Sequence, residues 1–100
     1  MTPQTVNLDH VIESWSNCGF DSQYHSETAG YSIQNEIRDT DELIMLLDGA
    51  MRIELDGEIV QPKRGEVLLI PALKPHSIVS VGGAETTWLS GIEREDPCTD

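Results

Sequence analysis

The chain has 100 residues and a mass of 11.1 kDa, which is the size of one domain and leaves no room within it for a second catalytic domain. Eighteen acidic residues against six basic ones give a formal net charge of −12. Because such a charge repels phosphate backbones and anionic lipid, it argues against nucleic acid or a membrane surface as the partner. The sequence has neither a signal-peptide pattern nor an apolar stretch near the ~20 residues of a membrane span, so we expect a cytoplasmic protein.

The first segment of the chain has the pattern of a short amphipathic helix. Its apolar residues recur at helical spacings: Leu8, Val11, Ile12 and Trp15. Asn7 is a suitable N-cap, and Gly19 is a suitable stop. We therefore expect residues 1–18 to form a helical segment that packs on the outside of the main domain, with Trp15 as its docking anchor.

The rest of the chain alternates short apolar runs with turn signals, a pattern typical of a β-sandwich or barrel. The predicted strands include residues 43–47, 50–55, 66–70, 76–81 and 86–91. Asp48-Gly49 and Asp56-Gly57 lie between apolar runs, and Asp-Gly pairs in that setting are the strongest short-range hairpin signal. We predict one all-β domain over residues 19–93 with a hairpin at each pair, followed by an acidic flexible tail over residues 94–100.

Two groups of residues resemble the motifs of the cupin superfamily, whose members are small jelly-roll, or double-stranded β-helix, barrels. The first cupin motif consists of a Gly, a His-x-His pair, a Glu and a second Gly. At the same spacings, but without either histidine, this chain has Gly30, Glu36-Ile37-Arg38, Glu42 and Gly49.

The second cupin motif consists of a Gly, a Pro-x-Gly group, a His and an Asn. Here the second Gly and the Asn are replaced, and the corresponding residues are Gly65, Pro71-Ala72-Leu73, His76 and Ser80. The resemblance covers residues 19–92 and is closest to short bacterial single-domain cupins of unassigned function. It implies a cupin-type jelly-roll barrel with a short N-terminal helix.

The resemblance also implies a site inside the barrel. In a cupin, the His-x-His pair, the Glu and the second-motif His converge on one divalent metal ion. The corresponding residues here are Glu36, Arg38, Glu42 and His76, and Gln34 is expected to share the inward face of Glu36 because residues two apart on a strand point the same way. The expected ligand-binding residues of the barrel interior are therefore Gln34, Glu36, Arg38, Glu42 and His76.

Whether the site holds a metal ion depends on the role of Arg38, and two interpretations stay open. Glu36, Glu42 and His76 offer oxygen and nitrogen ligands that suit one divalent ion such as zinc, manganese, iron or nickel. Arg38 has no lone pair to offer, and its fixed charge opposes a cation. In the other interpretation no metal is bound, because the guanidinium takes the place of the ion and pairs with both carboxylates.

The leading functional hypothesis is a small molecule bound in the barrel interior beside a degenerate metal site. One alternative is a metal-dependent isomerase, epimerase or dioxygenase that uses Glu36, Glu42 and His76. Another is a non-catalytic oligomerising accessory or sensor protein.

Exposed sheet edges favour a homodimer, with an apolar interface near Met51 or Trp88. In a chain with no export signal, the cysteines are expected to be reduced.

Overall fold

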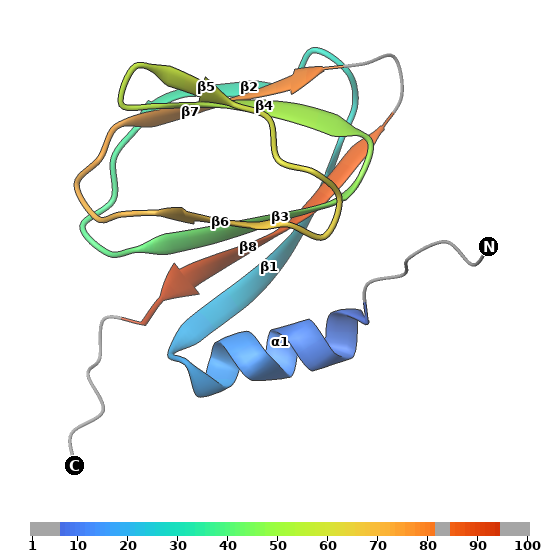
Figure 1. The fold of residues 1–100 in the computed structure, drawn as a ribbon, viewed down its shortest axis with the longest axis vertical. Helices are drawn as coiled ribbons and strands as arrows, with labels where there is room; N and C mark the ends of the chain where they lie inside the picture. Colours follow the sequence, from blue (N-terminus) through green and yellow to red (C-terminus); the bar gives the residue numbers. More distant parts are fainter. Residues whose placement is uncertain (1–6, 82–84, 95–100) are drawn as a thin grey trace.

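The computed structural model describes residues 7–81 and 85–94 of the chain (Figure 1). One helix, α1 (Leu8–Asn17), precedes eight strands. The strands are β1 (Phe20–Glu27), β2 (Ser32–Glu36), β3 (Glu42–Asp48), β4 (Ala50–Leu55), β5 (Glu58–Val60), β6 (Val67–Ile70), β7 (His76–Val81) and β8 (Thr86–Glu93). Within the described ranges, no helix is long and apolar enough to cross a membrane.

The strands form two four-stranded antiparallel sheets that face each other (Figure 1). Their orders are β1-β8-β3-β6 and β2-β7-β4-β5, so that every pair of consecutive strands except β4 and β5 is divided between the two sheets. This is the arrangement of a jelly roll. The predicted all-β jelly roll with an N-terminal helix is therefore confirmed, and each of the five predicted strands is present.

The two Asp-Gly pairs have different roles. Asp56 and Gly57 both have positive φ, 53° and 86°, and they join β4 to β5 in the predicted hairpin. The prediction of a hairpin at Asp48-Gly49 is wrong, because β3 pairs with β6 and β8 whereas β4 pairs with β5 and β7. Both sides of β3 are taken by strands from elsewhere in the chain, so Gly49 instead carries the backbone from one sheet to the other.

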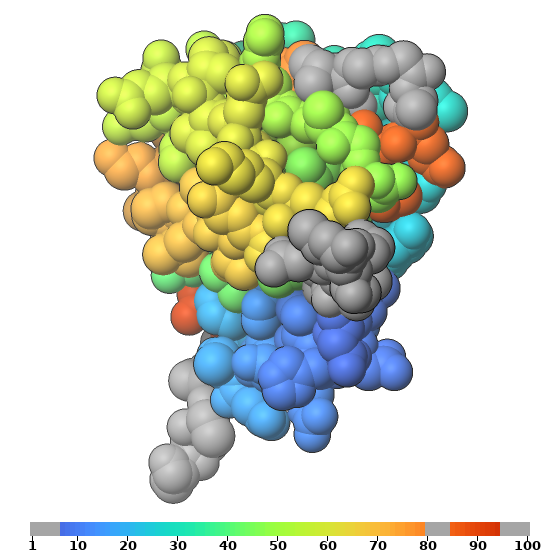
Figure 2. All heavy atoms as spheres, turned by 45° about the vertical axis from the view of Figure 1, so that its right-hand side comes forward, coloured from blue at the N-terminus to red at the C-terminus, as the bar shows by residue number. Residues whose placement is uncertain are grey.

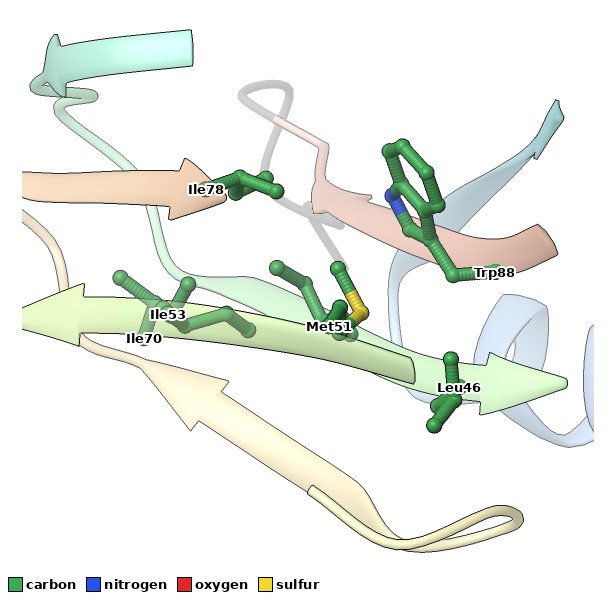
Figure 3. Close-up of a cluster of buried hydrophobic side chains, with 7 residues drawn as sticks. Leu46, Met51, Ile53, Ile70, Ile78 and Trp88 are labelled. Atoms are coloured by element: carbon green, nitrogen blue, oxygen red, sulfur yellow. The ribbon is translucent and has the colours of Figure 1, made fainter. Parts of the chain in front are cut away.

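Inward-facing side chains of both sheets fill the space between them (Figure 3). This core consists of Ile44, Leu46, Met51, Ile53, Ile70, Ile78 and Trp88. Met51 and Trp88 are each only 1% exposed, so neither can lie at the surface where a partner would bind. Their own side chains belong to the core, and a dimer interface near these two residues stays a prediction.

The helix α1 lies against one side of the barrel (Figure 2). It packs on the outer face of the β1-β8-β3-β6 sheet, where Trp15 forms a buried cluster with Met45 and Leu89. A Cβ atom on Gly91 would lie 2.7 Å from Cε3 of Trp15, so the absence of a side chain there allows the indole to approach the sheet. At the other end of the helix, the Asn7 side chain accepts a hydrogen bond of 3.1 Å from the backbone N–H of His10. The expected roles of Trp15 and Asn7 are confirmed.

The predicted acidic tail is described only at its first residue. The backbone N–H of Arg94 donates to the carbonyl of Gly19 at 2.8 Å, and its side chain contacts Asp21 at 2.6 Å. Arg94 therefore belongs to the folded part of the chain, and not to a flexible tail. Residues 95–100, which include Cys98, lie outside the described residues, while Cys18 is exposed directly after α1.

Candidate functional site

Four of the five predicted site residues meet at one end of the barrel. Glu36 is the last residue of β2, Glu42 the first of β3 and His76 the first of β7. Glu36 lies directly opposite His76 in the pairing of β2 with β7. Arg38 lies in the short connection between β2 and β3, so its side chain can reach the same end.

The charged groups of this cluster surround one carboxylate oxygen. Oε1 of Glu42 is 3.4 Å from Nε2 of His76 and 3.4 Å from Nε of Arg38. Glu36 lies farther away, at 3.7 Å from Nε2 of His76 and 3.9 Å from Nη2 of Arg38. The ion pairs expected between Arg38 and the two carboxylates are therefore present, although their distances are those of loose pairs rather than of short hydrogen bonds.

Burial divides the cluster into an inner and an outer half. The side chains of His76 and Glu42 are 1% and 6% exposed, whereas those of Glu36 and Arg38 are 36% and 40% exposed. Burial raises the pKa of Glu42, and the nearby His76 and Arg38 oppose that rise. Within the described part of the chain, Oε1 of Glu42 and both ring nitrogens of His76 have no hydrogen-bond partner. Buried polar atoms of this kind are normally satisfied, and a polar ligand or an ion would satisfy them.

Glu36, Glu42 and His76 also fit the requirements of a metal site. One donor atom from each lies within 4.8 Å of the other two. Ligands bound at ~2.1 Å to a single ion stand roughly 3–4 Å apart, so small side-chain shifts would suffice. Arg38 opposes this use of the site, because a dication ~5 Å from its charge would be repelled by roughly 7 kcal/mol at an effective dielectric constant of about 20. The guanidinium in its observed position would therefore weaken the binding of a metal ion to these donors.

Gln34 does not join the cluster. It is exposed, whereas its neighbour Ile33 is partly buried against the core. The register of β2 shifts between Ile33 and Glu36, and Asn35 has a positive φ of 55° while its backbone N–H donates to Oγ of Ser77 at 3.0 Å. This irregularity breaks the alternation on which the prediction relied, so Gln34 and Glu36 do not share a face.

His25 is a partly buried residue that no sequence motif contains. Its ring stacks on Trp88 with centroids 5.0 Å apart and planes inclined by 13°. Its Nε2 lies 2.8 Å from Oγ of Ser90, and its backbone lies opposite Trp88 in the β1–β8 register. The long-range register of β1 with β8 places His25 against Trp88, and the local sequence does not show this pairing.

The environment of His25 predicts a pH-dependent stability. Burial lowers the pKa of His25 below 6.5, Arg38 lowers it further and Glu27 partly opposes the change. The unfolded chain therefore binds more protons than the folded one below about pH 6.5, and the free energy of unfolding falls as the pH drops through that window. Urea unfolding at pH 7.5 and 5.5 should show a smaller decrease for His25→Gln than for wild type. Equal decreases in the free energy of unfolding of the two proteins would contradict the assignment of this pH dependence to His25.

A surface groove of about 470 Å³ adjoins the cluster. It is lined by residues 37–40 together with Leu73, Ile92 and Glu93. Arg38 belongs both to this groove and to the ion pairs with Glu36 and Glu42. Arg38 is therefore the residue of the cluster that also lines the groove.

A family model described as the cupin domain matches residues 24–92. The chain belongs to the cupin family. The predicted resemblance is thereby confirmed, and this cupin keeps a histidine of the second motif in the form of His76. No match was found among curated proteins.

Solved structures similar to this cupin include a conserved protein of unknown function from Streptococcus pyogenes, with 20% identity, a TM-score of 0.70, and coverage of 79% of this chain and 68% of that one. A cupin 2 domain-containing protein from Halorhodospira halophila has 18% identity and a TM-score of 0.69, and the match covers 75% of this chain and 52% of that one. A predicted oxalate decarboxylase from Thermotoga maritima has 19% identity and a TM-score of 0.68, and the match covers 81% of this chain and 72% of that one. At such identities, these similarities establish the fold and not the chemistry.

Proposed function

We propose that this cupin binds a small molecule at the cluster of Glu36, Arg38, Glu42 and His76, without a resident metal. The observation that carries the proposal is the position of Arg38, whose guanidinium lies 3.4 Å from Glu42 and 3.9 Å from Glu36. It supplies the positive charge that a metal would otherwise bring to the two carboxylates. The unpartnered ring nitrogens of buried His76 are then available to a polar ligand.

A metal-dependent enzyme is the second candidate, and the donor set of Glu36, Glu42 and His76 favours it. In that case Arg38 would have to leave both carboxylates and turn towards the substrate. A bound divalent ion would supply Lewis-acid chemistry, and His76 and the carboxylates would hold it. A non-catalytic accessory role and a cytoplasmic location stay predictions.

Metal content separates the two candidates. We expect protein purified without added metal or chelator to contain far less than one equivalent of zinc, manganese, iron or nickel by elemental analysis. The reason is the fixed charge of Arg38 beside the oxygens that an ion would need. Stoichiometric metal in untreated wild-type protein would instead assign the site to Glu36, Glu42 and His76 as metal ligands.

We further propose that a second copy of this chain pairs with the free edge of β1. Natural proteins protect edge strands by shortness, bulges, Pro or Lys. Of the four edge strands, β5 and β6 are only 3 and 4 residues long, and β2 contains a register irregularity. By contrast, β1 is 8 residues long, pairs with β8 without interruption and contains neither Pro nor Lys. Its Tyr24 is 59% exposed, which supplies apolar area that a monomer does not use.

Light scattering can test this assembly. Wild type is expected to have twice the 11.1 kDa mass of one chain, and Tyr24→Glu is expected to be monomeric because a like-charge pair then faces the two-fold axis. Val67→Glu is the matched control, since Val67 is 45% exposed on the other edge strand of the same sheet. Dissociation by Val67→Glu but not by Tyr24→Glu, or a monomeric wild type at high concentration, would contradict the proposal.

A further inference from the structure

Leu73 has a backbone conformation that leucine rarely adopts. Its φ is 68°, and the other non-glycine residues with positive φ in the described ranges are Asn35 and Asp56. Asn and Asp tolerate this left-handed region through their short polar side chains, whereas leucine gains nothing from it. The Leu73 side chain is also 69% exposed, so packing in the core does not compensate for the strain.

The backbone around Leu73 is held by three hydrogen bonds. Its N–H donates to the carbonyl of Arg38 at 2.7 Å, and the N–H of Ala72 donates to Oδ1 of Asp41 at 2.8 Å. The turn is closed by the N–H of Lys74, which donates to the carbonyl of Pro71 at 3.3 Å. A glycine at position 73 could make the same backbone bonds without strain. Strain retained together with an exposed apolar side chain indicates a role for that side chain outside the fold.

Leu73 lies on the wall of the groove that shares Arg38 with the charged cluster. Ile37, on the same groove, is 58% exposed, so two large apolar side chains are presented at one entrance. The groove volume of about 470 Å³ falls within the ~300–1,000 Å³ of pockets that hold small molecules. This arrangement suits the hydrocarbon part of a ligand whose polar end lies beside the charged residues of the groove.

The charge around the groove selects the polar end of that ligand. Its lining has one cation, Arg38, against two anions, Asp39 and Glu93. The adjoining Glu36 and Glu42 add further negative charge, and the chain as a whole carries −12. This field repels a carboxylate or phosphate and attracts a cation. A ligand ammonium group can donate hydrogen bonds to the carboxylates of Asp39 and Glu93, which line the groove itself.

We propose that the groove binds a small primary amine with an apolar body, with Leu73 and Ile37 against the hydrocarbon and the ammonium group at the acidic end. This inference rests on the proposed binding of a small molecule at the cluster, and it adds the ligand class and a specificity-determining residue. Leu73 occupies the position of the second glycine of the cupin motif, and its positive φ is one that glycine adopts without strain.

The test compares hexylammonium, hexanol and hexanoate, which share one chain length, by ligand-observed NMR titration of the full chain. We expect hexylammonium to bind most tightly and hexanoate least. Leu73→Asn, which tolerates positive φ, and Leu73→Gly, which relieves the strain, should each weaken hexylammonium binding by roughly tenfold through lost apolar contact. Thermal unfolding should show that Leu73→Gly still folds. The control Leu69→Thr changes a leucine that is 49% exposed on β6, outside the groove, and should leave the affinity unchanged.

Hexanol or hexanoate binding as tightly as hexylammonium would overturn the assignment of the ligand class. Equal affinity in Leu73→Asn, Leu73→Gly and wild type would overturn the role of Leu73. Failure of all three probes to bind would overturn the groove as an amine site. The metal analysis needs no organic probe, so it decides separately whether Arg38 takes the place of a metal.

Discussion

Arg38→His is expected to convert this cupin into a protein that retains stoichiometric divalent metal. The substitution removes the positive charge that lies 3.4 Å from Oε1 of Glu42, and it adds an imidazole beside Glu36, Glu42 and His76. Four nitrogen and oxygen donors at one end of the barrel then meet the needs of zinc or manganese. At a metal concentration of about 100 times Kd, binding should stabilise the folded variant by about 2.7 kcal/mol.

Elemental analysis and thermal unfolding with and without added zinc measure this gain. Arg38→Gln removes the same charge without adding an imidazole, so it should bind metal more weakly than Arg38→His. Arg52→His is the matched control, because Arg52 is exposed on β4 and does not belong to the cluster. Equal metal content in Arg52→His and Arg38→His, or none in Arg38→His, would show that the charge of Arg38 is not what keeps metal out.

Gly49→Ala is expected to lower the free energy of unfolding by roughly 2–5 kcal/mol, from ~1–2 kcal/mol of backbone strain and ~1–3 kcal/mol of overpacking. Gly49 has a φ of 89°, and a Cβ there would lie 2.6 Å from Oγ1 of Thr86 and 2.9 Å from the carbonyl oxygen of Glu85. Thr86 cannot move aside easily, because it is fully buried and its Oγ1 donates to the carbonyl of Ala50 at 3.2 Å.

Gly57→Ala separates the loss of stability caused by steric contact from the loss caused by backbone strain. Gly57 has nearly the same φ, 86°, but a Cβ there would meet no atom within 4 Å. Its substitution should therefore cost only the backbone strain of about 1–2 kcal/mol. Urea unfolding of the two variants measures the difference, and equal losses of stability would contradict the close approach of Gly49 to β8.

The features that the sequence determined by itself are those that depend on neighbouring residues. The helix follows from apolar residues at helical spacing, and its packing on the sheet through Trp15 follows from the apolar face that they form. The hairpin at Asp56-Gly57 follows from two residues that tolerate positive φ between apolar runs. The resemblance to the cupin motifs also predicted that Glu36, Glu42 and His76 lie close together, although His76 is far from the other two in the sequence.

Contacts between distant parts of the chain decided the features that local sequence did not predict. Asp48-Gly49 has the same local chemistry as the hairpin pair, yet β3 finds its partners in β6 and β8, so the chain changes sheet there. The bulge in β2 turns Gln34 outward, and the register of β1 with β8 places His25 on Trp88. Backbone bonds between two distant loops hold Leu73 at positive φ. None of these arrangements is encoded within a few residues, because each depends on which strands and loops meet across the barrel.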